Sequence, residues 1–215
     1  MTMPLASLGR EIAGQLIVTF TRLITAPQSD WRAPPSPGQR IYFANHASHG
    51  DFVLIWSVLP AKFRRRTRPV AAADYWDRGW LRRLIGKGVL RAVLISRERV
   101  TRSNDPIETM ASALDTGESL IVFPEGTRNL GSERLLPFKS GLYHLARARP
   151  RVELVPVWIA NLNRVMPKGE FLPVPLLCTV RFGAPLSLRE GEAKAEFLGR
   201  AQAALLDLAP REWHP

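Results

Sequence analysis

From residue 40 onward, short β-rich runs alternate with segments of helical periodicity, and this alternation restricts the possible folds more than any other feature. The predicted strands cover residues 40–44, 69–73, 92–96, 120–123, 154–159 and 178–182. The predicted helices cover residues 51–59, 77–86, 106–116, 139–148 and 189–208. We therefore expect a single α/β domain in which a mostly parallel sheet is flanked by helices. Because parallel sheets place active sites beyond the carboxyl ends of their strands, chemistry should lie in the loops after the strands.

Residues 4–25 have the pattern of an amphipathic helix. Apolar residues recur at helical spacing, namely Leu5, Leu8, Ile12, Leu16, Phe20, Leu23 and Ile24. We expect residues 1–27 to form this helix, residues 28–39, rich in Pro, Ser and Gly, to act as a linker, and residues 40–215 to form the main domain. Such a helix either covers part of the core or lies in a membrane interface, and this segment alone favours packing on the core. Its uncharged runs are too short for a bilayer span, which takes about 20 apolar residues.

Positive charge is concentrated in one part of the chain. The 30 basic and 19 acidic residues give a formal charge of +11, and residues 62–102 hold thirteen of the bases but only three of the acids. Such a patch attracts polyanions: nucleic acid, an anionic membrane surface, a phosphorylated substrate or an acidic carrier protein. Because no helix-turn-helix, RNP-like or zinc-finger pattern is present, we expect no nucleic-acid partner. The lone Cys178 leaves no intramolecular disulfide, which favours a reducing compartment such as the cytoplasm.

The loop after the first predicted strand of the domain carries a histidine and an aspartate at a suggestive spacing. In NHASHGD, residues 45–51, Ser48 is a predicted N-cap, and Asp51 stands three residues later in the position of the acidic capping-box partner. From the first helical turn, the Asp51 carboxylate can reach back to the His46 imidazole and raise its basicity. The sequence has no GxSxG nucleophile, and Cys178 lies inside a predicted strand, so His46 would deprotonate a hydroxyl of the substrate. The alternative is that Asp51 only caps the helix and His46 only fills a turn.

A second loop, residues 123–128 (FPEGTR), follows the strand predicted at 120–123. Gly126 would let backbone N–H groups approach a ligand, Thr127 adds a hydroxyl, and Arg128 offers a planar fork that suits phosphate oxygens. Together these residues would form an anion site. The alternative is an ordinary turn closed by a solvated arginine. Glu125 could pair with Arg128 or position the backbone, and the sequence does not decide between the two.

Taken together, these loops resemble the glycerolipid acyltransferases, the family typified by lysophosphatidic acid acyltransferase. Residues 45–51 match the family's NHxxxxD, FPEGTRN at 123–129 matches its FPEGTRS, and VPVWI at 155–159 matches its VPVxI. The three blocks occur in the family's order within residues 40–160, and an ordered set of this kind is highly specific.

The resemblance is incomplete in one further block. The family's GxxFIxR is met only partly by RAVLISR at 91–97, where Arg91 replaces the glycine and Leu94 the phenylalanine. Asn129 stands where the family usually has serine, which leaves the head group of the acceptor less certain than the reaction. FKSG at 138–141 resembles the FKxG that commonly follows the third block, and Lys139 would add a positive charge to the phosphate site.

The resemblance implies transfer of an acyl group from a thioester, acyl-CoA or acyl-carrier protein, to the free hydroxyl of 1-acylglycerol 3-phosphate, giving phosphatidic acid. His46 would take the hydroxyl proton and Asp51 would hold the imidazolium, with no acyl-enzyme, metal or cofactor. Arg97 and Arg128 would clamp the phosphate. The full set of implied substrate-binding residues is Arg97, Glu125, Gly126, Thr127, Arg128 and Lys139. The alternatives are another lyso-lipid acceptor, or a non-catalytic protein that binds anionic lipids.

The same resemblance changes the interpretation of the N-terminal helix and of the basic stretch. The helix becomes a membrane-interface anchor, and residues 62–102, with Trp76 and Trp80, become a surface for anionic lipid head groups and for an acidic carrier. We then expect a peripheral protein on the cytoplasmic side of the cell membrane. His49 matches no fixed family position and has no second metal ligand nearby, so we expect no metal site.

Overall fold

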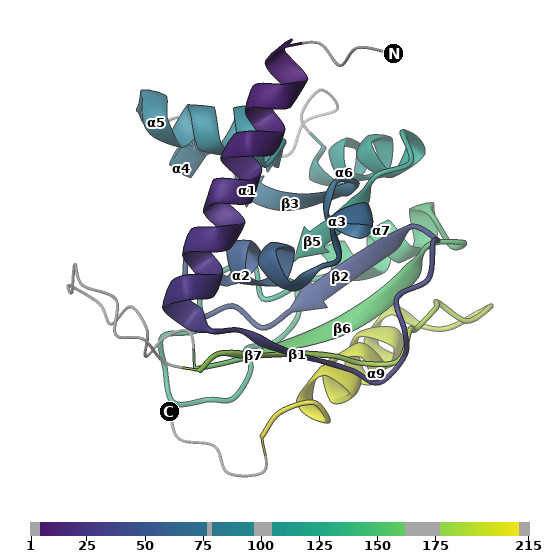
Figure 1. The fold of residues 1–215 in the computed structure, drawn as a ribbon. Helices are drawn as coiled ribbons and strands as arrows, with labels where there is room; N and C mark the ends of the chain where they lie inside the picture. Colours follow the sequence, from purple (N-terminus) through teal and green to yellow (C-terminus); the bar gives the residue numbers. More distant parts are fainter. Residues whose placement is uncertain (1–4, 77–78, 97–104, 162–176, 211–215) are drawn as a thin grey trace.

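The structure of the chain, a computed structural model, describes residues 5–76, 79–96, 105–161 and 177–210. Seven strands form one sheet in the order β1-β7-β6-β2-β5-β3-β4, with helices packed against it (Figure 1). The strands are β1 Gln28–Trp31, β2 Arg40–Ala44, β3 Thr67–Ala72, β4 Val93–Ile95, β5 Ser119–Val122, β6 Glu153–Ala160 and β7 Thr179–Phe182. Every pairing is parallel except β6 with β7. The predicted α/β domain with a mostly parallel sheet is confirmed.

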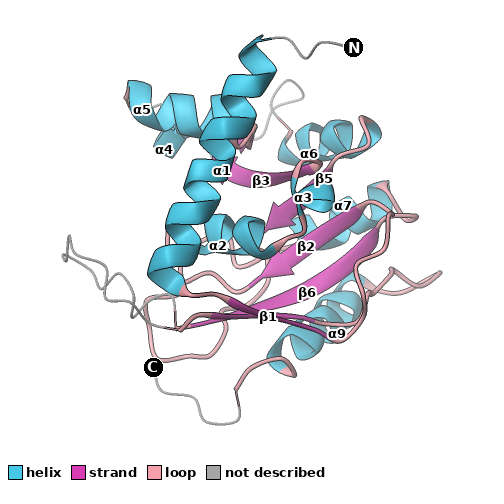
Figure 2. Cartoon of the chain, in the orientation of Figure 1, coloured by secondary structure: helices cyan, strands magenta, loops and turns pink. Residues whose placement is uncertain are grey.

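The helices flank the sheet, as Figure 2 shows. They are α1 Leu5–Thr25, α2 Asp51–Val58, α3 Ala61–Arg64, α4 Ala73–Trp76, α5 Trp80–Arg83, α6 Pro106–Asp115, α7 Gly141–Ala148 and α9 Lys194–Leu206, with a π-helical segment η1 at Leu84–Val89. The helix predicted over 77–86 is present from Trp80, but it changes from α-helical in α5 to π-helical in η1 at Leu84. The predicted last helix begins five residues later than expected, at Lys194.

Both faces of the central strands are buried, as a parallel sheet covered by helices requires. Successive side chains of a strand point to opposite faces, so β2 contributes Ile41 and Phe43 to one hydrophobic core, and Tyr42 and Ala44 to another. The first core is completed mainly by α6, α7 and α9, and the second mainly by α2 and one face of α1. The loops after β2 and β5 are therefore carried by strands that are buried on both faces.

Helix α1 packs on the domain through a face other than its apolar stripe. Gly14 and Val18 are buried, and a Cβ at Gly14 would lie 3.2 Å from Cη2 of Trp56, so the missing side chain permits a close approach to α2. The Arg22 guanidinium donates to the Ser57 carbonyl oxygen. The stripe faces outward, since five of its side chains are 47% to 76% exposed: Leu8, Ile12, Leu16, Phe20 and Leu23. The helix does cover part of the core, as the segment alone favours, but mainly through the face that carries Gly14 and Val18.

The predicted linker, residues 28–39, contains a strand. Its first four residues form β1, which pairs in parallel with β7 at the edge of the sheet. The Cys178 N–H donates to the Thr25 carbonyl oxygen at 3.0 Å, and the Gln28 N–H donates to the Cys178 carbonyl oxygen at 2.8 Å. The chain thus passes from α1 directly into the sheet. Within the described residues, no helix combines the length and the apolarity that crossing a membrane would take.

Candidate active site

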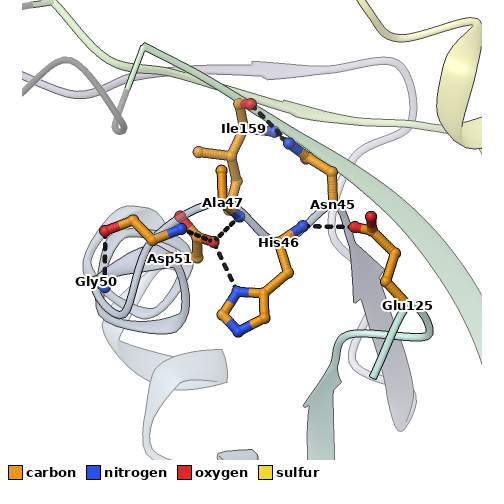
Figure 3. A network of polar contacts seen from close by, with 8 residues as sticks. Asn45, His46, Ala47, Gly50, Asp51, Glu125 and Ile159 are labelled. Atoms are coloured by element: carbon orange, nitrogen blue, oxygen red, sulfur yellow. Dashed lines mark hydrogen bonds and ion pairs between the residues drawn. The ribbon is translucent and has the colours of Figure 1, made fainter. Parts of the chain in front are cut away.

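The two loops singled out in the sequence lie next to each other. Residues 45–51 follow β2, residues 123–128 follow β5, and these strands are parallel neighbours, so their carboxyl ends meet at one edge of the sheet. Figure 3 shows the resulting network of polar contacts around His46.

The His46–Asp51 pair has the predicted geometry. His46 Nδ1 lies 2.8 Å from Asp51 Oδ2, and the same oxygen accepts the backbone N–H groups of Ala47 at 2.7 Å and Ser48 at 2.9 Å (Figure 3). Asp51 is 1% exposed, and it begins α2, where the positive end of the helix dipole favours a carboxylate. Three donors thus converge on one buried oxygen and fix its position.

This arrangement selects one tautomer of the histidine. Because Asp51 accepts the proton on Nδ1, Nε2 carries the lone pair, and Figure 3 shows Nε2 pointing away from Asp51. The imidazole also stacks on the Phe123 ring, with 4.2 Å between the ring centroids and 18° between the planes. The ring is held on one face and at one nitrogen, so its second nitrogen is placed to accept a proton from a ligand.

The helix start differs from the predicted capping box. The N-cap of α2 is Gly50, and the Ser48 hydroxyl accepts the Gly50 N–H at 3.2 Å instead of capping the helix. The acidic half of the box is present, because the Asp51 carboxylate does reach back to the Ser48 N–H. The carboxylate therefore orders the loop and orients His46 at once.

Asn45 anchors the base of this loop, a role that the sequence analysis missed. Its side-chain amide nitrogen donates to the Ile159 carbonyl oxygen at 3.0 Å, and its amide oxygen accepts the Ile159 N–H at 2.8 Å. Asn45 thereby imitates one more residue of β2 paired with β6. The only signal in the sequence is an asparagine directly after a buried strand.

Glu125 joins the two loops from inside the fold. The residue is 2% exposed; Oε1 accepts the His46 N–H at 2.8 Å, and Oε2 accepts the Leu136 N–H at 2.9 Å. Burial raises the pKa of this carboxyl, and the two backbone donors oppose the increase. Both oxygens are occupied by the protein itself. Of the two roles left open by the sequence, the geometry favours positioning the backbone over pairing with Arg128.

The Lys139 side chain lies close to Gly126. Gly126 has a φ of +69°, and a Cβ there would come within 2.7 to 2.9 Å of the Lys139 side chain, so only glycine lets that chain lie across the turn. The Lys139 N–H donates to the Pro124 carbonyl oxygen at 2.8 Å. The Gly126 N–H donates to the Phe123 carbonyl oxygen at 3.0 Å, so this N–H closes the turn.

The remaining predicted residues are only partly brought together. Thr127 is exposed and Arg128 is half-buried, in the same loop as Gly126. Arg97 lies outside the described residues. Asn129 stands where the family usually has serine. Its backbone N–H donates to the His46 carbonyl oxygen at 2.6 Å, and its side-chain nitrogen donates to the Glu133 carbonyl oxygen at 2.7 Å. Asn129 is therefore a second loop-ordering residue that the sequence analysis did not identify.

The comparisons with known proteins agree with this geometry. Residues 29–160 match the sequence model of the Acyltransferase family. A 1-acyl-sn-glycerol-3-phosphate acyltransferase of Cocos nucifera is 30% identical over 183 residues, 81% of this chain and 55% of that protein. The human 1-acyl-sn-glycerol-3-phosphate acyltransferase alpha is 31% identical over 160 residues, 71% of this chain and 51% of that protein. The chain thus spans about half the length of the curated relatives it matches.

The fold has a counterpart among solved structures. The crystal structure of the 1-acyl-sn-glycerophosphate (LPA) acyltransferase PlsC from Thermotoga maritima superposes with a TM-score of 0.69 and covers 99% of this chain and 86% of that one, at 20% sequence identity. That match shows a shared fold. With the family match over residues 29–160 and the paired His46 and Asp51, it leads to one conclusion. The chain belongs to the acyltransferase family.

Proposed function

We propose that the protein is a 1-acylglycerol-3-phosphate acyltransferase, which transfers an acyl group from acyl-CoA or acyl-carrier protein to the free hydroxyl of 1-acylglycerol 3-phosphate. The observation that carries the proposal is the His46–Asp51 pair at 2.8 Å, with Nε2 of His46 turned away from the carboxylate. The names of the curated relatives support the choice of acceptor.

In the proposed reaction, Nε2 of His46 removes the proton of the acceptor hydroxyl while the oxygen attacks the thioester carbonyl carbon. The tetrahedral intermediate collapses, the C–S bond breaks, and the imidazolium returns the proton to the departing thiolate. The buried Asp51 stabilises the imidazolium between the two steps. Acyl transfer through a protein thiol is disfavoured, because burial, with the nearby Asp51 charge, raises the pKa of the Cys178 thiol to about 11.

The phosphate of the acceptor would be bound by the loop after β5. Arg128 offers a guanidinium that suits two phosphate oxygens, and Lys139, lying across Gly126, adds a second cation. Both residues belong to the segments next to the loop of His46, so a phosphate held there would bring a glycerol hydroxyl near Nε2. Holding the reactants in this way can lower the barrier by several kcal/mol.

The protein would act at a membrane surface, where its lipid acceptor is found. The apolar stripe of α1 supports this, because it is exposed along five side chains of one helix face, and a stripe of this kind needs an apolar environment. The side chain of Trp80, also part of the proposed surface, is 77% exposed. We propose a peripheral, interfacial position on an anionic membrane, on its cytoplasmic side.

The test is thiol release from acyl-CoA and from acyl-carrier protein, measured with a panel of lyso-lipid acceptors. We expect turnover with 1-acylglycerol 3-phosphate in the wild type and a kcat at least ~100-fold lower in His46→Ala, the low end for loss of a general base. Asp51→Asn should also lower kcat, because the amide favours the wrong tautomer of His46. Circular dichroism and thermal unfolding of each variant control for folding.

Two results would contradict the proposal. If His46→Ala keeps activity within a few-fold of wild type, the dyad is not the base. If no donor releases thiol with any acceptor, the protein is a lipid-binding module. Faster turnover of another lyso-lipid would support the proposed chemistry but assign a different acceptor. Such an acceptor is the second candidate, because Asn129 stands where the family usually has serine.

A further inference from the structure

A cationic cavity lies away from the loops of His46. It has a volume of about 680 Å³ and is formed by α1, β3, η1, α6 and the residues leading into β4. Its polar lining includes Arg10, Arg68, Lys87, Arg91, Ser112 and Thr116. No acidic residue is among the described residues that line it.

The cavity and the acyl-transfer site are at opposite edges of the sheet. Arg68 is the second residue of β3, and Arg91 precedes β4, so both lie at the amino ends of their strands. His46 follows the carboxyl end of β2. Because β2, β5, β3 and β4 are parallel, these two ends face opposite ways, and an occupant of the cavity would be separate from the acceptor bound near His46.

Arg91 occupies this cavity with a strained backbone. Its φ is +53°, in the left-handed region that glycine adopts freely and arginine rarely does. Arg91 stands where the family pattern GxxFIxR has glycine. Its carbonyl oxygen accepts the Nε–H of Arg68, and its guanidinium pairs with Glu118. An arginine is therefore present where its backbone conformation is strained. Strained residues of this kind are concentrated at functional sites.

Burial and a neighbouring cation disfavour the charged form of Arg68, and Glu118 offsets them only in part. Burial lowers the pKa of the Arg68 guanidinium, the Glu118 carboxylate opposes this shift, and the Arg91 charge lowers the pKa further. A phosphate would meet guanidinium and ammonium donors from three separate elements, and the hydroxyl of Ser112 adds another donor group at the wall. The four basic residues line one open cavity, Arg10 and Lys87 from exposed positions and Arg68 and Arg91 from half-buried ones.

We propose that this cavity is a second anion site, which binds a phosphate group independently of the acyl-transfer site. Because Arg10 comes from α1 and Arg91 from the edge of the sheet, a bound phosphate would also tie the first turns of α1 to the domain. The phosphate could belong to a lipid head group or to a soluble molecule, and the two sources have the same chemistry.

Thermal unfolding with increasing inorganic phosphate, at constant ionic strength set with chloride, tests the site. All proteins carry Arg128→Ala, so that the acyl-transfer site does not dominate the signal. Arg10→Gln with Lys87→Gln removes two exposed cations of the cavity, and Arg91→Gly removes a third while suiting the positive φ. Arg151→Gln removes one positive charge, as Arg91→Gly does, but from an exposed position outside the cavity. It is the matched control.

We expect phosphate to stabilise the Arg128→Ala protein, with an apparent Kd that rises about tenfold or more in both cavity variants and stays within about twofold in Arg151→Gln. The absence of phosphate-dependent stabilisation in the Arg128→Ala background would overturn the proposal. An equal weakening in the Arg151→Gln control would also overturn it, since it would indicate a general charge effect.

Flotation with phosphatidylcholine vesicles, with and without phosphatidic acid, distinguishes the sources of the phosphate. If the cavity variants bind phosphatidic acid vesicles more weakly than Arg151→Gln does, and inorganic phosphate competes, the ligand is a lipid head group. If vesicle binding is unchanged by the cavity variants while their Kd for inorganic phosphate rises, the ligand is soluble. Both results support the site. If the variants change neither measurement, there is no anion site.

Discussion

Two buried carboxylates order the active-site loops by accepting backbone N–H groups. Asp51 accepts two N–H groups and the His46 ring, and Glu125 accepts N–H groups from the loops on either side of it. Carboxylates suit this task, because each oxygen accepts hydrogen bonds from several directions without a donor of its own. The proposed active site would therefore depend on residues that orient His46 as well as on His46 itself.

Glu125→Gln should lower stability and kcat together while leaving the KM for the phosphate acceptor nearly unchanged. The amide nitrogen would face a backbone N–H, and an unsatisfied buried group costs about 1–3 kcal/mol. Thermal unfolding and steady-state kinetics measure both effects, with Glu133→Gln in the exposed part of the same loop as the control. A raised acceptor KM with unchanged stability would instead place Glu125 on the substrate.

Arg128→Lys should raise the KM for 1-acylglycerol 3-phosphate while leaving the donor KM nearly unchanged. Lysine keeps the charge but loses the paired hydrogen bonds of the guanidinium. Alanine should be worse, because losing a contact of about 1.5–3 kcal/mol lowers kcat/KM roughly 10- to 150-fold. Arg134→Ala, an exposed arginine in the same loop, is the control. Equal damage with a dephosphorylated acceptor would show that Arg128 does not bind the phosphate.

At the scale of elements, α1 has two faces with different tasks. The face with Gly14 and Val18 packs on α2 and η1, and the opposite face carries the exposed apolar stripe. Because residues four apart lie on one face of a helix, the two functions can be changed separately by substitution. Deleting the whole helix would not separate them, since α1 is also hydrogen-bonded to the sheet through Thr25.

Replacing Leu16 and Phe20 with glutamate should weaken vesicle binding at least ~10-fold without lowering the melting temperature. Burying each side chain in a membrane interface contributes about 1.5–3 kcal/mol, whereas in the free protein both are about two thirds exposed. Liposome flotation measures the binding, and Gln15→Glu, an exposed position on the polar side of the helix, controls for added negative charge. Unchanged binding, or a loss of stability, would contradict the interfacial position.

Helix α9 is held at its start by an ion pair whose strength should depend on pH. Arg200 binds both oxygens of Glu192, at 2.8 Å and 2.7 Å, and this hydrogen bonding holds the pKa of Glu192 below its usual value near 4.5. A lowered pKa in the folded state means that the stabilisation is present above the unfolded-state pKa and is lost as the pH falls through the folded-state value.

We therefore expect Glu192→Gln to lower the free energy of unfolding by about 1–2 kcal/mol near neutral pH, because a buried charge-assisted pair is lost. The difference from wild type should disappear at acid pH, where Glu192 is protonated in both states. Chemical denaturation over a pH series measures it, and Glu190→Gln, an exposed neighbour, is the control. A difference that persists in acid would mean that the pair acts through packing and not through charge.

The whole molecule combines a sheet that is buried at its centre with a strongly basic exterior. Its formal charge is +11, most of it from residues 62–102, which include β3 and the edge strand β4. A charge of this size steers the protein toward anionic surfaces over roughly a Debye length, about 8 Å at physiological salt. Electrostatic attraction and the apolar stripe would then contribute separately to membrane binding.

Raising the salt concentration should release the protein from anionic vesicles. The Debye length falls to about 3 Å at 1 M salt, so exposed cations lose most of their attraction, while burial of the stripe is hardly weakened. Flotation should show a steep salt dependence with anionic vesicles and a weak, nearly salt-independent binding to neutral ones. Salt-independent binding to anionic vesicles would assign the interaction to the stripe alone.

The features that the sequence determined are those fixed by short stretches of chain. The alternation of strand and helix predicted the α/β sheet, because each periodicity is local and a buried parallel sheet is the architecture that accommodates it. The contact of His46 with Asp51 was predictable for the same reason, since they are five positions apart in one loop and connectivity alone brings them within reach.

The features that only the tertiary structure decided connect residues far apart in the chain. Glu125 binds the His46 N–H across 79 positions, and Asn45 binds Ile159 across 114, so both contacts depend on which strands are neighbours. The tertiary structure also decided which face of α1 packs on the domain, because Gly14 allows a closer approach to Trp56 than the bulky apolar stripe would. Periodicity shows that a face is apolar but not what covers it, because the partner surface is made by segments distant in sequence.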